Sequence, residues 1–202
     1  MSSDVPPLHS DTSIPVSAPT RAEGPNWQRF AFLTVLVIVT VAVRLLPHPR
    51  NVTPIGAVAL FGGATLASPV AALGVTLTAL FVSDLFVGLH FLMLPVYACF
   101  LFNVWLGRRL GAKPGPVRIA GGTLIGSVVF FVVTNFATWL AFYEPTAAGL
   151  ATCYLRGLPD FVNTIAGDLF FSGLLFGALS LAEGRFPVLR PLPSAAAAPA
   201  AA

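Results

Sequence analysis

Long apolar runs fill the middle of the chain, and short polar or proline-containing segments separate one run from the next. A run of about 20 apolar residues is what an α-helix needs to cross the hydrocarbon core of a bilayer. The pattern therefore predicts an all-α, polytopic membrane protein with six transmembrane helices. We place these helices at residues 28–46, 54–67, 69–88, 91–108, 116–142 and 160–182.

Glycine and proline indicate where the predicted helices end, bend or pack. The second helix is short and rich in glycine, so we expect it to be broken or tilted. Ser68-Pro69 indicates a tight turn into the third helix. Small residues four apart allow neighbouring helices to pack closely. Gly122 with Gly126 and Gly173 with Gly177 are such pairs, and we expect them to serve packing.

Composition supports a location in the bilayer. Of the 202 residues, 56% are hydrophobic and 9% are charged, and the mean hydropathy is +0.84, whereas soluble domains carry about 25% charged residues. We expect one compact membrane domain at residues 29–186, without room for a separate soluble enzyme. Residues 1–28 are rich in Ser, Pro and Thr and predict a disordered tail, and residues 187–202 predict a Pro/Ala-rich C-terminal tail.

Basic residues predict the orientation. They lie before the first helix (Arg21, Arg29), between the fourth and fifth (Arg108, Arg109, Lys113, Arg118) and after the sixth (Arg185, Arg190). With six spans these positions share one side, which the positive-inside rule makes cytoplasmic, together with both termini. Arg44, Arg50 and Arg156 fall on the opposite, outer side. Pairing with acids or with a ligand would explain these three exceptions.

Ionisable and amide side chains lie at or just inside the ends of several predicted helices, where an unpaired charge is costly. The most prominent are Arg44, Asp84, Asn135 and Asp168. Three polar clusters converge on the outer side: residues 44–54, residues 83–90, and residues 134–139 with 160–168. Thr164, Asp168 and Ser172 are four residues apart and predict a polar stripe along one helix. These observations indicate a polar site inside the bundle.

The same residues also allow a structural interpretation. Arg44 paired with Asp84 or Asp168 could be a structural ion pair, or the pair could also line a ligand cavity. Trp139 and Tyr143 could anchor a helix end at the membrane interface or stack on an aromatic solute.

Enzyme and cofactor motifs are absent from the sequence. The Gly-x-Gly-Asp signature of intramembrane aspartyl proteases does not occur at Asp168, and zinc, nucleophile-elbow and phosphate-loop motifs are missing. Cys99 lies in an apolar run and Cys153 in a predicted loop, so neither has a partner at metal or disulfide spacing. We predict no catalytic residue, no metal, no cofactor and no nucleic-acid partner.

Four segments carry a resemblance to a known family. They are RLLPHPRNVTPIGAVALFGGA at residues 44–64, VSDLFVG at 82–88, VTNFATW at 133–139 and NTIAGDL at 163–169. Through these motifs the chain resembles an uncharacterised bacterial family of predicted membrane transport proteins. That family in turn resembles the substrate-binding S components of energy-coupling factor (ECF) vitamin transporters.

The resemblance implies an ECF S-component-like bundle in the bacterial inner membrane, whose helices and outer loops enclose a vitamin or similar small molecule. The family's motif residues correspond here to Arg44, Asn51, Asp84, Asn135, Asn163 and Asp168. Many S components dock on their coupling partner through an Ala-x-x-x-Ala pattern, which the first helix lacks. An energising ATPase module could therefore be contacted through other residues, or the protein could work alone.

We hypothesise that the protein takes up a vitamin-like or other small molecule through an outward-facing polar pocket, and that it is not an enzyme. The predicted substrate-binding residues are Arg44, Arg50, Asn51, Asp84, Asn135, Trp139, Asn163 and Asp168. The alternative is a non-transporting membrane scaffold subunit of a cell-envelope assembly. A solute binder should leave its polar groups around a cavity, whereas a scaffold should leave them bonded to one another.

Overall fold

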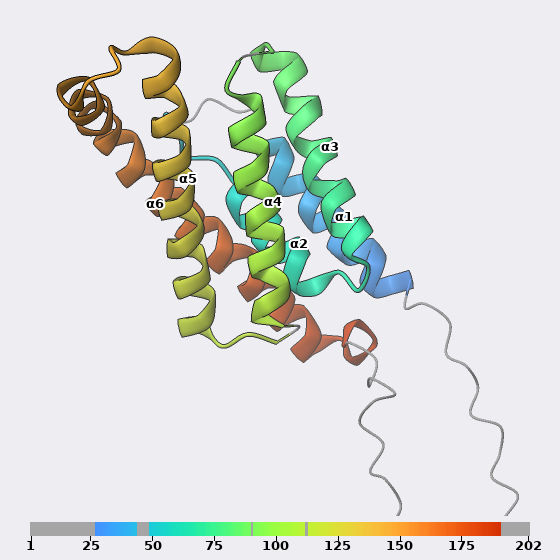
Figure 1. The fold of residues 1–202 in the computed structure, drawn as a ribbon. Helices are drawn as coiled ribbons and strands as arrows, with labels where there is room; N and C mark the ends of the chain where they lie inside the picture. Colours follow the sequence, from blue (N-terminus) through green and yellow to red (C-terminus); the bar gives the residue numbers. More distant parts are fainter. Residues whose placement is uncertain (1–26, 44–48, 90, 112, 191–202) are drawn as a thin grey trace, which may run out of the picture.

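The computed structural model describes residues 27–43, 49–89, 91–111 and 113–190. These residues form six α-helices, one short 3-10 helix and no strand, which confirms the all-α class (Figure 1). The elements are α1 (Trp27–Val43), α2 (Ile55–Thr65), α3 (Pro69–Val87), α4 (Met93–Leu110), α5 (Pro116–Phe142), α6 (Ala147–Arg185) and η1 (Pro187–Leu189). Most of both predicted tails lies outside the described residues.

Three helices in this part of the chain are long and apolar enough to cross a membrane: α3, α5 and α6. They agree with a membrane protein, while the prediction of six spans stays a prediction. The turn before α3 is confirmed, because the Ser68 side chain caps the helix by accepting a bond from the Ala71 amide at 3.2 Å. Pro69 takes the first helical position, where a missing N–H costs nothing.

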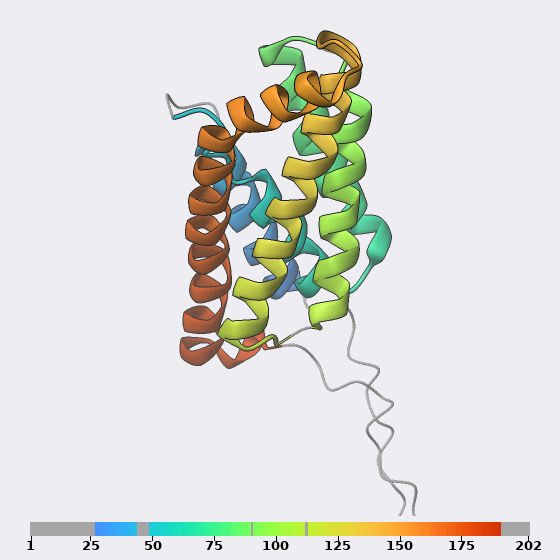
Figure 2. The same cartoon turned by 60° about the vertical axis from the view of Figure 1, so that its left-hand side comes forward.

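The sixth helix begins at Ala147, so the prediction of a loop up to Asp160 is wrong. The Thr146 side chain caps this start by accepting a bond from the Gly149 amide at 3.0 Å. Pro159 lies inside the helix, where proline removes a backbone bond and bends the axis. The first turns of α6, drawn in orange in Figure 2, cross the top of the bundle before the helix runs down along it.

Helix α2 lies at the centre of the bundle (Figure 1) and contacts each of the five other α-helices. All of its 11 residues are buried. At about 1.5 Å per residue the helix is roughly 16 Å long, about half the thickness of a bilayer's hydrocarbon core. The second helix is short, as the sequence predicted, but it is one continuous helix, so the expected break is not found.

Two glycines let α2 and α4 touch through their backbones. A Cβ atom added at Gly63 would lie less than 3.0 Å from the carbonyl oxygen of Val104, and one added at Gly107 would lie equally close to that of Leu60. A backbone carbonyl cannot rotate away as a side chain can. These two positions therefore set the distance between the two helices.

The two predicted glycine pairs behave differently. Gly122 packs against Leu110 and Gly126 against Asn103, as a packing role requires. A Cβ atom added at Gly173 or Gly177 would meet nothing within 4 Å, so the packing prediction for this second pair is wrong. Both of these glycines line an open cleft instead.

The start of α1, the α4–α5 loop and η1 lie at the same end of the bundle, which is the lower end in Figure 1. Arg29 on α1 forms an ion pair with Glu183 on α6 and donates a hydrogen bond to the carbonyl oxygen of Leu189. The described basic residues that predict the orientation thus belong to segments at one end. Which side of a membrane that end faces stays a prediction.

We predict that Gly107→Ala lowers the free energy of unfolding by about 2–3 kcal/mol, because overpacking against a fixed backbone cannot relax easily. Gly74→Ala on α3 is the matched control, since its added Cβ would meet nothing within 4 Å. It should be neutral or stabilising by up to about 1 kcal/mol. Thermal unfolding of the detergent-purified variants checks this, and equal melting temperatures would contradict it.

Candidate functional site

The predicted polar stripe on α6 faces a second polar stripe on α5. Ser127 Oγ donates a hydrogen bond to Asp168 Oδ2 at 2.7 Å, and Thr123 Oγ1 bonds Ser172 Oγ at 3.0 Å. All four side chains are buried. We call this line of contact the α5–α6 seam. Cavities lie at both of its ends.

The upper cavity lies at the end of the bundle where α5 turns into α6, and its volume is about 340 Å³. Its walls come mainly from α5 and α6, with Leu92 and Val96 at the start of α4 and Asn51 from the loop before α2. The polar side chains among them are Asn51, Thr134, Asn135, Thr138, Tyr143, Arg156, Asp160 and Thr164. Arg156 belongs to the first part of α6, for which the sequence predicts a loop. These additional helical turns, from Ala147 to Pro159, thus form much of the cavity wall.

Asn135 is held in the wall of this cavity from two sides. Its Nδ2 donates to the Phe131 carbonyl oxygen at 2.8 Å, one turn earlier on the same helix. Its carboxamide also lies against Gly157 on α6, where an added Cβ would clash with Oδ1. Cys153 Sγ donates to the Asn135 carbonyl oxygen at 3.4 Å, so this cysteine is a buried helix contact and not the loop residue predicted.

A much smaller cavity of about 30 Å³ lies directly below, and we call it the Asp168 cavity. It shares Asn51, Phe130 and Thr164 with the upper cavity. Asp168 and Asn103 line this cavity but not the upper one. The two cavities are therefore adjacent compartments of one polar region.

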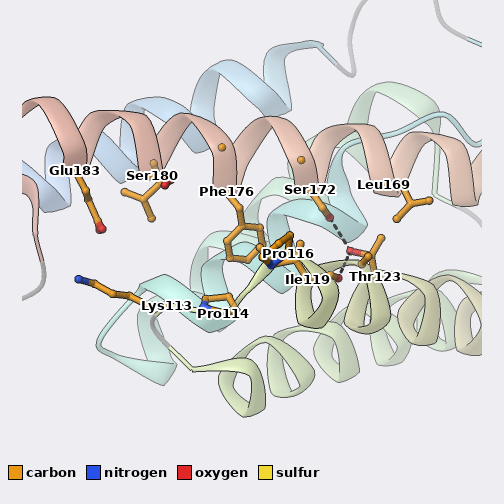
Figure 3. A pocket seen from close by; sticks show the side chains of 14 residues that line it. Lys113, Pro114, Pro116, Ile119, Thr123, Leu169, Ser172, Phe176, Ser180 and Glu183 are labelled. Carbon is orange, nitrogen blue, oxygen red and sulfur yellow. Dashed lines mark hydrogen bonds between the residues drawn. The ribbon is translucent and has the colours of Figure 1, made fainter.

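The lower cleft lies at the opposite end of the seam and has a volume of about 590 Å³. Figure 3 shows Thr123 and Ser172 bonded at its inner end, while Lys113 and Glu183 lie on opposite walls farther out. The seam thus separates two larger spaces at opposite ends of the bundle. The hydrogen bonds of Ser127 and Thr123 hold it closed between them.

The structure brings together some of the predicted binding residues. Asn51 and Asn135 line the upper cavity, and Asn51 and Asp168 line the small cavity beneath it. Asn51 adopts a φ of 60°, a left-handed conformation that asparagine tolerates better than most residues. Arg44, with both ion pairs predicted for it, lies outside the described residues.

Four other predicted residues do not line these cavities. Arg50 is exposed and Asn163 is half-buried on another face of α6. Trp139 Nε1 donates to the Glu144 carbonyl oxygen at 3.0 Å and so fastens the turn between α5 and α6. Asp84 is buried on α3 and accepts a hydrogen bond from Tyr97 of α4 at 2.8 Å. The two buried aspartates therefore belong to different parts of the bundle.

Asn103 is the lining residue that sequence reasoning missed. It lies in the middle of α4, is buried, and its Oδ1 has no hydrogen-bond partner among the described residues. The only available signal was a single amide within an apolar run. No group of three or more His, Cys, Asp or Glu in the described part of the chain could hold a metal ion.

We predict that Ser127→Ala destabilises the protein by about 1–3 kcal/mol, because the buried Asp168 carboxyl loses its hydrogen-bond donor. Ser180→Ala is the matched control, since Ser180 also lies on α6 but is exposed in the lower cleft. Its effect should stay within about 0.5 kcal/mol. Thermal unfolding in detergent measures both, and a harmless Ser127→Ala would mean that the bond contributes little.

Comparison with known proteins yields one match. A protein-family model described as a family of unknown function (DUF6580) covers residues 25–189. No curated protein and no solved structure matches the chain.

Proposed function

Because the chain belongs to the DUF6580 family, whose function is unknown, we propose a function from its own geometry: it binds a small polar solute in the upper cavity and takes it up across the bacterial inner membrane. The observation that carries the proposal is the cavity itself. Its volume of about 340 Å³ falls within the roughly 300–1,000 Å³ of small-molecule sites. The proposal assigns no catalytic step and no cofactor to the protein.

The lining favours a solute that combines charge with a flat apolar part. Arg156 and Asp160 contribute opposite charges, and neither forms a salt bridge among the described residues. Phe131 and Phe161 stack in the wall with ring centroids 4.4 Å apart. A zwitterionic or vitamin-like molecule would use the charged pair for orientation and the rings for contact.

Uptake across the membrane is supported by the arrangement of the seam. The upper cavity and the lower cleft lie at opposite ends of the same pair of helices, so opening the seam would connect them. An S-component-like mode of action, with an energising ATPase partner, belongs to the proposal as well. The first helix lacks the Ala-x-x-x-Ala pattern through which many S components dock on their partner. The second form of the proposal is therefore facilitated transport without a partner.

A scaffold role remains the alternative, and one observation favours it. Several buried polar groups are satisfied by bonds between helices, as a structural role requires: Asp84 with Tyr97, and Asp168 with Ser127. In that case Asn135 would serve packing against Gly157 alone. The two functions can be separated by replacing residues that line the cavity.

We predict that a small molecule co-purifies with the wild type in mild detergent and that its amount falls roughly tenfold in Asn135→Ala and Arg156→Gln. A tenfold loss corresponds to about 1.4 kcal/mol, which is the scale of one polar contact. Mass spectrometry of extracted small molecules measures it. Asn135 bonds only its own helix through Nδ2, so Asn135→Ala should unfold at nearly the wild-type temperature.

Asn163→Ala is the matched control, because this asparagine lies on α6 outside the cavities and should retain the compound. If no compound is found and Asn135→Ala is clearly destabilised, the scaffold function is favoured. If Asn163→Ala loses the compound as strongly as Asn135→Ala does, the solute does not occupy the upper cavity.

The proposed direction of uptake requires the lower end of the bundle to face the cytoplasm. We predict that reporters fused within the loop between α4 and α5, at residues 111–115, and after Arg190 report a cytoplasmic location. A reporter inserted between α5 and α6, near Glu144, should report the outer side. Reversed activities would place the upper cavity on the cytoplasmic side and overturn uptake through it.

A further inference from the structure

Asp168 places a carboxyl group deep in the bundle. Its side chain is 7% exposed, and a buried charge is costly unless it is paired or neutralised. Ser127 of α5 donates a hydrogen bond to it, and Gly56 of α2 lies against its Oδ1 atom. No Lys, Arg or His among the described residues lines the Asp168 cavity.

Helix α2 supports the ionised form of this carboxyl. Gly56 is the second residue of α2, and Pro54 at the N-cap makes no side-chain bond to the helix. The first amides of a helix carry a partial positive charge of about half a unit, which stabilises a nearby anion. An ionised carboxylate at this position needs a further partner, because no basic side chain of the described residues lines the cavity.

Asn103 supplies an independent observation. The residue is 4% exposed and lines the same cavity, yet its Oδ1 has no hydrogen-bond partner in the described part of the chain. An unsatisfied buried acceptor costs about 1–3 kcal/mol. A carboxamide oxygen can be satisfied by a donor or by a cation. A cation in this cavity would therefore satisfy both the Asp168 carboxylate and the Asn103 amide oxygen.

We infer that the Asp168 cavity binds a small monovalent cation, of which Na⁺ is the representative. The volume of about 30 Å³ holds a single small occupant. Five of the residues that line it carry a side-chain oxygen: Asn51, Thr53, Asn103, Thr164 and Asp168. Carboxylate, amide and hydroxyl oxygens are hard ligands that suit alkali and alkaline-earth ions. One carboxylate balances a single positive charge, which favours a monovalent ion.

The cavity also lies where a cation could influence solute binding. Asn51, Phe130 and Thr164 belong to both this cavity and the upper one. An ion that orders these side chains would preorganise the floor of the upper cavity. This consequence rests on the proposed function, whereas the cation site itself does not depend on any solute.

The test is thermal unfolding of the full chain in detergent, in NaCl, KCl or choline chloride at equal ionic strength. Choline is too large for the cavity and controls for the effect of salt. We expect the melting temperature to rise by roughly 3 °C or more as Na⁺ increases from 1 to about 100 mM, because a bound ion stabilises the folded state. Asp168→Asn should abolish this rise, and Asn103→Ala should reduce it.

Asp84→Asn is the matched control, because Asp84 is equally buried but lies outside the cavity. It should keep the full response to Na⁺. Equal melting temperatures of the wild type in NaCl and choline chloride would overturn the inference, as would a response lost in Asp84→Asn. If Asp168→Asn does not fold, equilibrium binding of radioactive ²²Na⁺ to the wild type and to Asn103→Ala decides the question.

The outcome separates the cation site from the proposed function. A protein that retains a co-purified solute but shows no specific response to Na⁺ or K⁺ would lose the cation site and keep the solute site. A protein that responds to Na⁺ through Asp168 but yields no solute would keep the cation site alone.

Discussion

The burial of α2 is the constraint on which the rest of the structure depends. This helix is shorter than a membrane span, and all of its residues are buried. Its backbone polar groups therefore depend on the surrounding protein, more than on water, for their partners. The C-terminal half is held by direct backbone contact with α4 at Gly63 and Gly107.

The N-terminal end of α2 is held differently, and this difference creates the polar region. Gly56 allows the Asp168 side chain to approach the first turn of α2, and Gly167 lets α6 approach the backbone of Val52 and Thr53. A carboxyl group near a helix N-terminus complements the helix dipole. The interaction that accommodates a short buried helix thus also places a carboxyl group beneath the upper cavity.

Much of the fold could be predicted from the sequence, because the lengths of the apolar runs and the positions of the turn residues indicate the same helix bounds. The predicted bounds of the third and fifth helices lie within one residue of α3 and α5. The predicted start of the sixth helix, at residue 160, was wrong because of Pro159. Proline is favoured in the first turn of a helix and disfavoured in its interior, so it indicated a helix start. Here the kink is tolerated, and the apolar segment from Ala147 packs across the top of the bundle.

The candidate site was predictable where its residues follow helical periodicity. Thr164, Asp168 and Ser172 repeat every four residues, so their common face could be deduced without a structure. Asn103 could not be found in this way, because its role depends on α4 lying against Gly126 of α5. Contacts between distant segments leave no local pattern in the sequence. The same reason explains why Asn163, which is close to Asp168 in sequence, lies outside the cavities.

The two buried aspartates show why burial alone does not define a site. Asp84 accepts a hydrogen bond from Tyr97, so a neighbouring helix satisfies it and the contact fastens α3 to α4. Asp168 also has a donor, Ser127, but it adjoins a small cavity and an amide oxygen without a partner. A packed interior excludes such space unless something occupies it, because empty volume and unsatisfied polar atoms both reduce stability. The space beside Asp168, more than its charge, is therefore what supports the proposed cation site there.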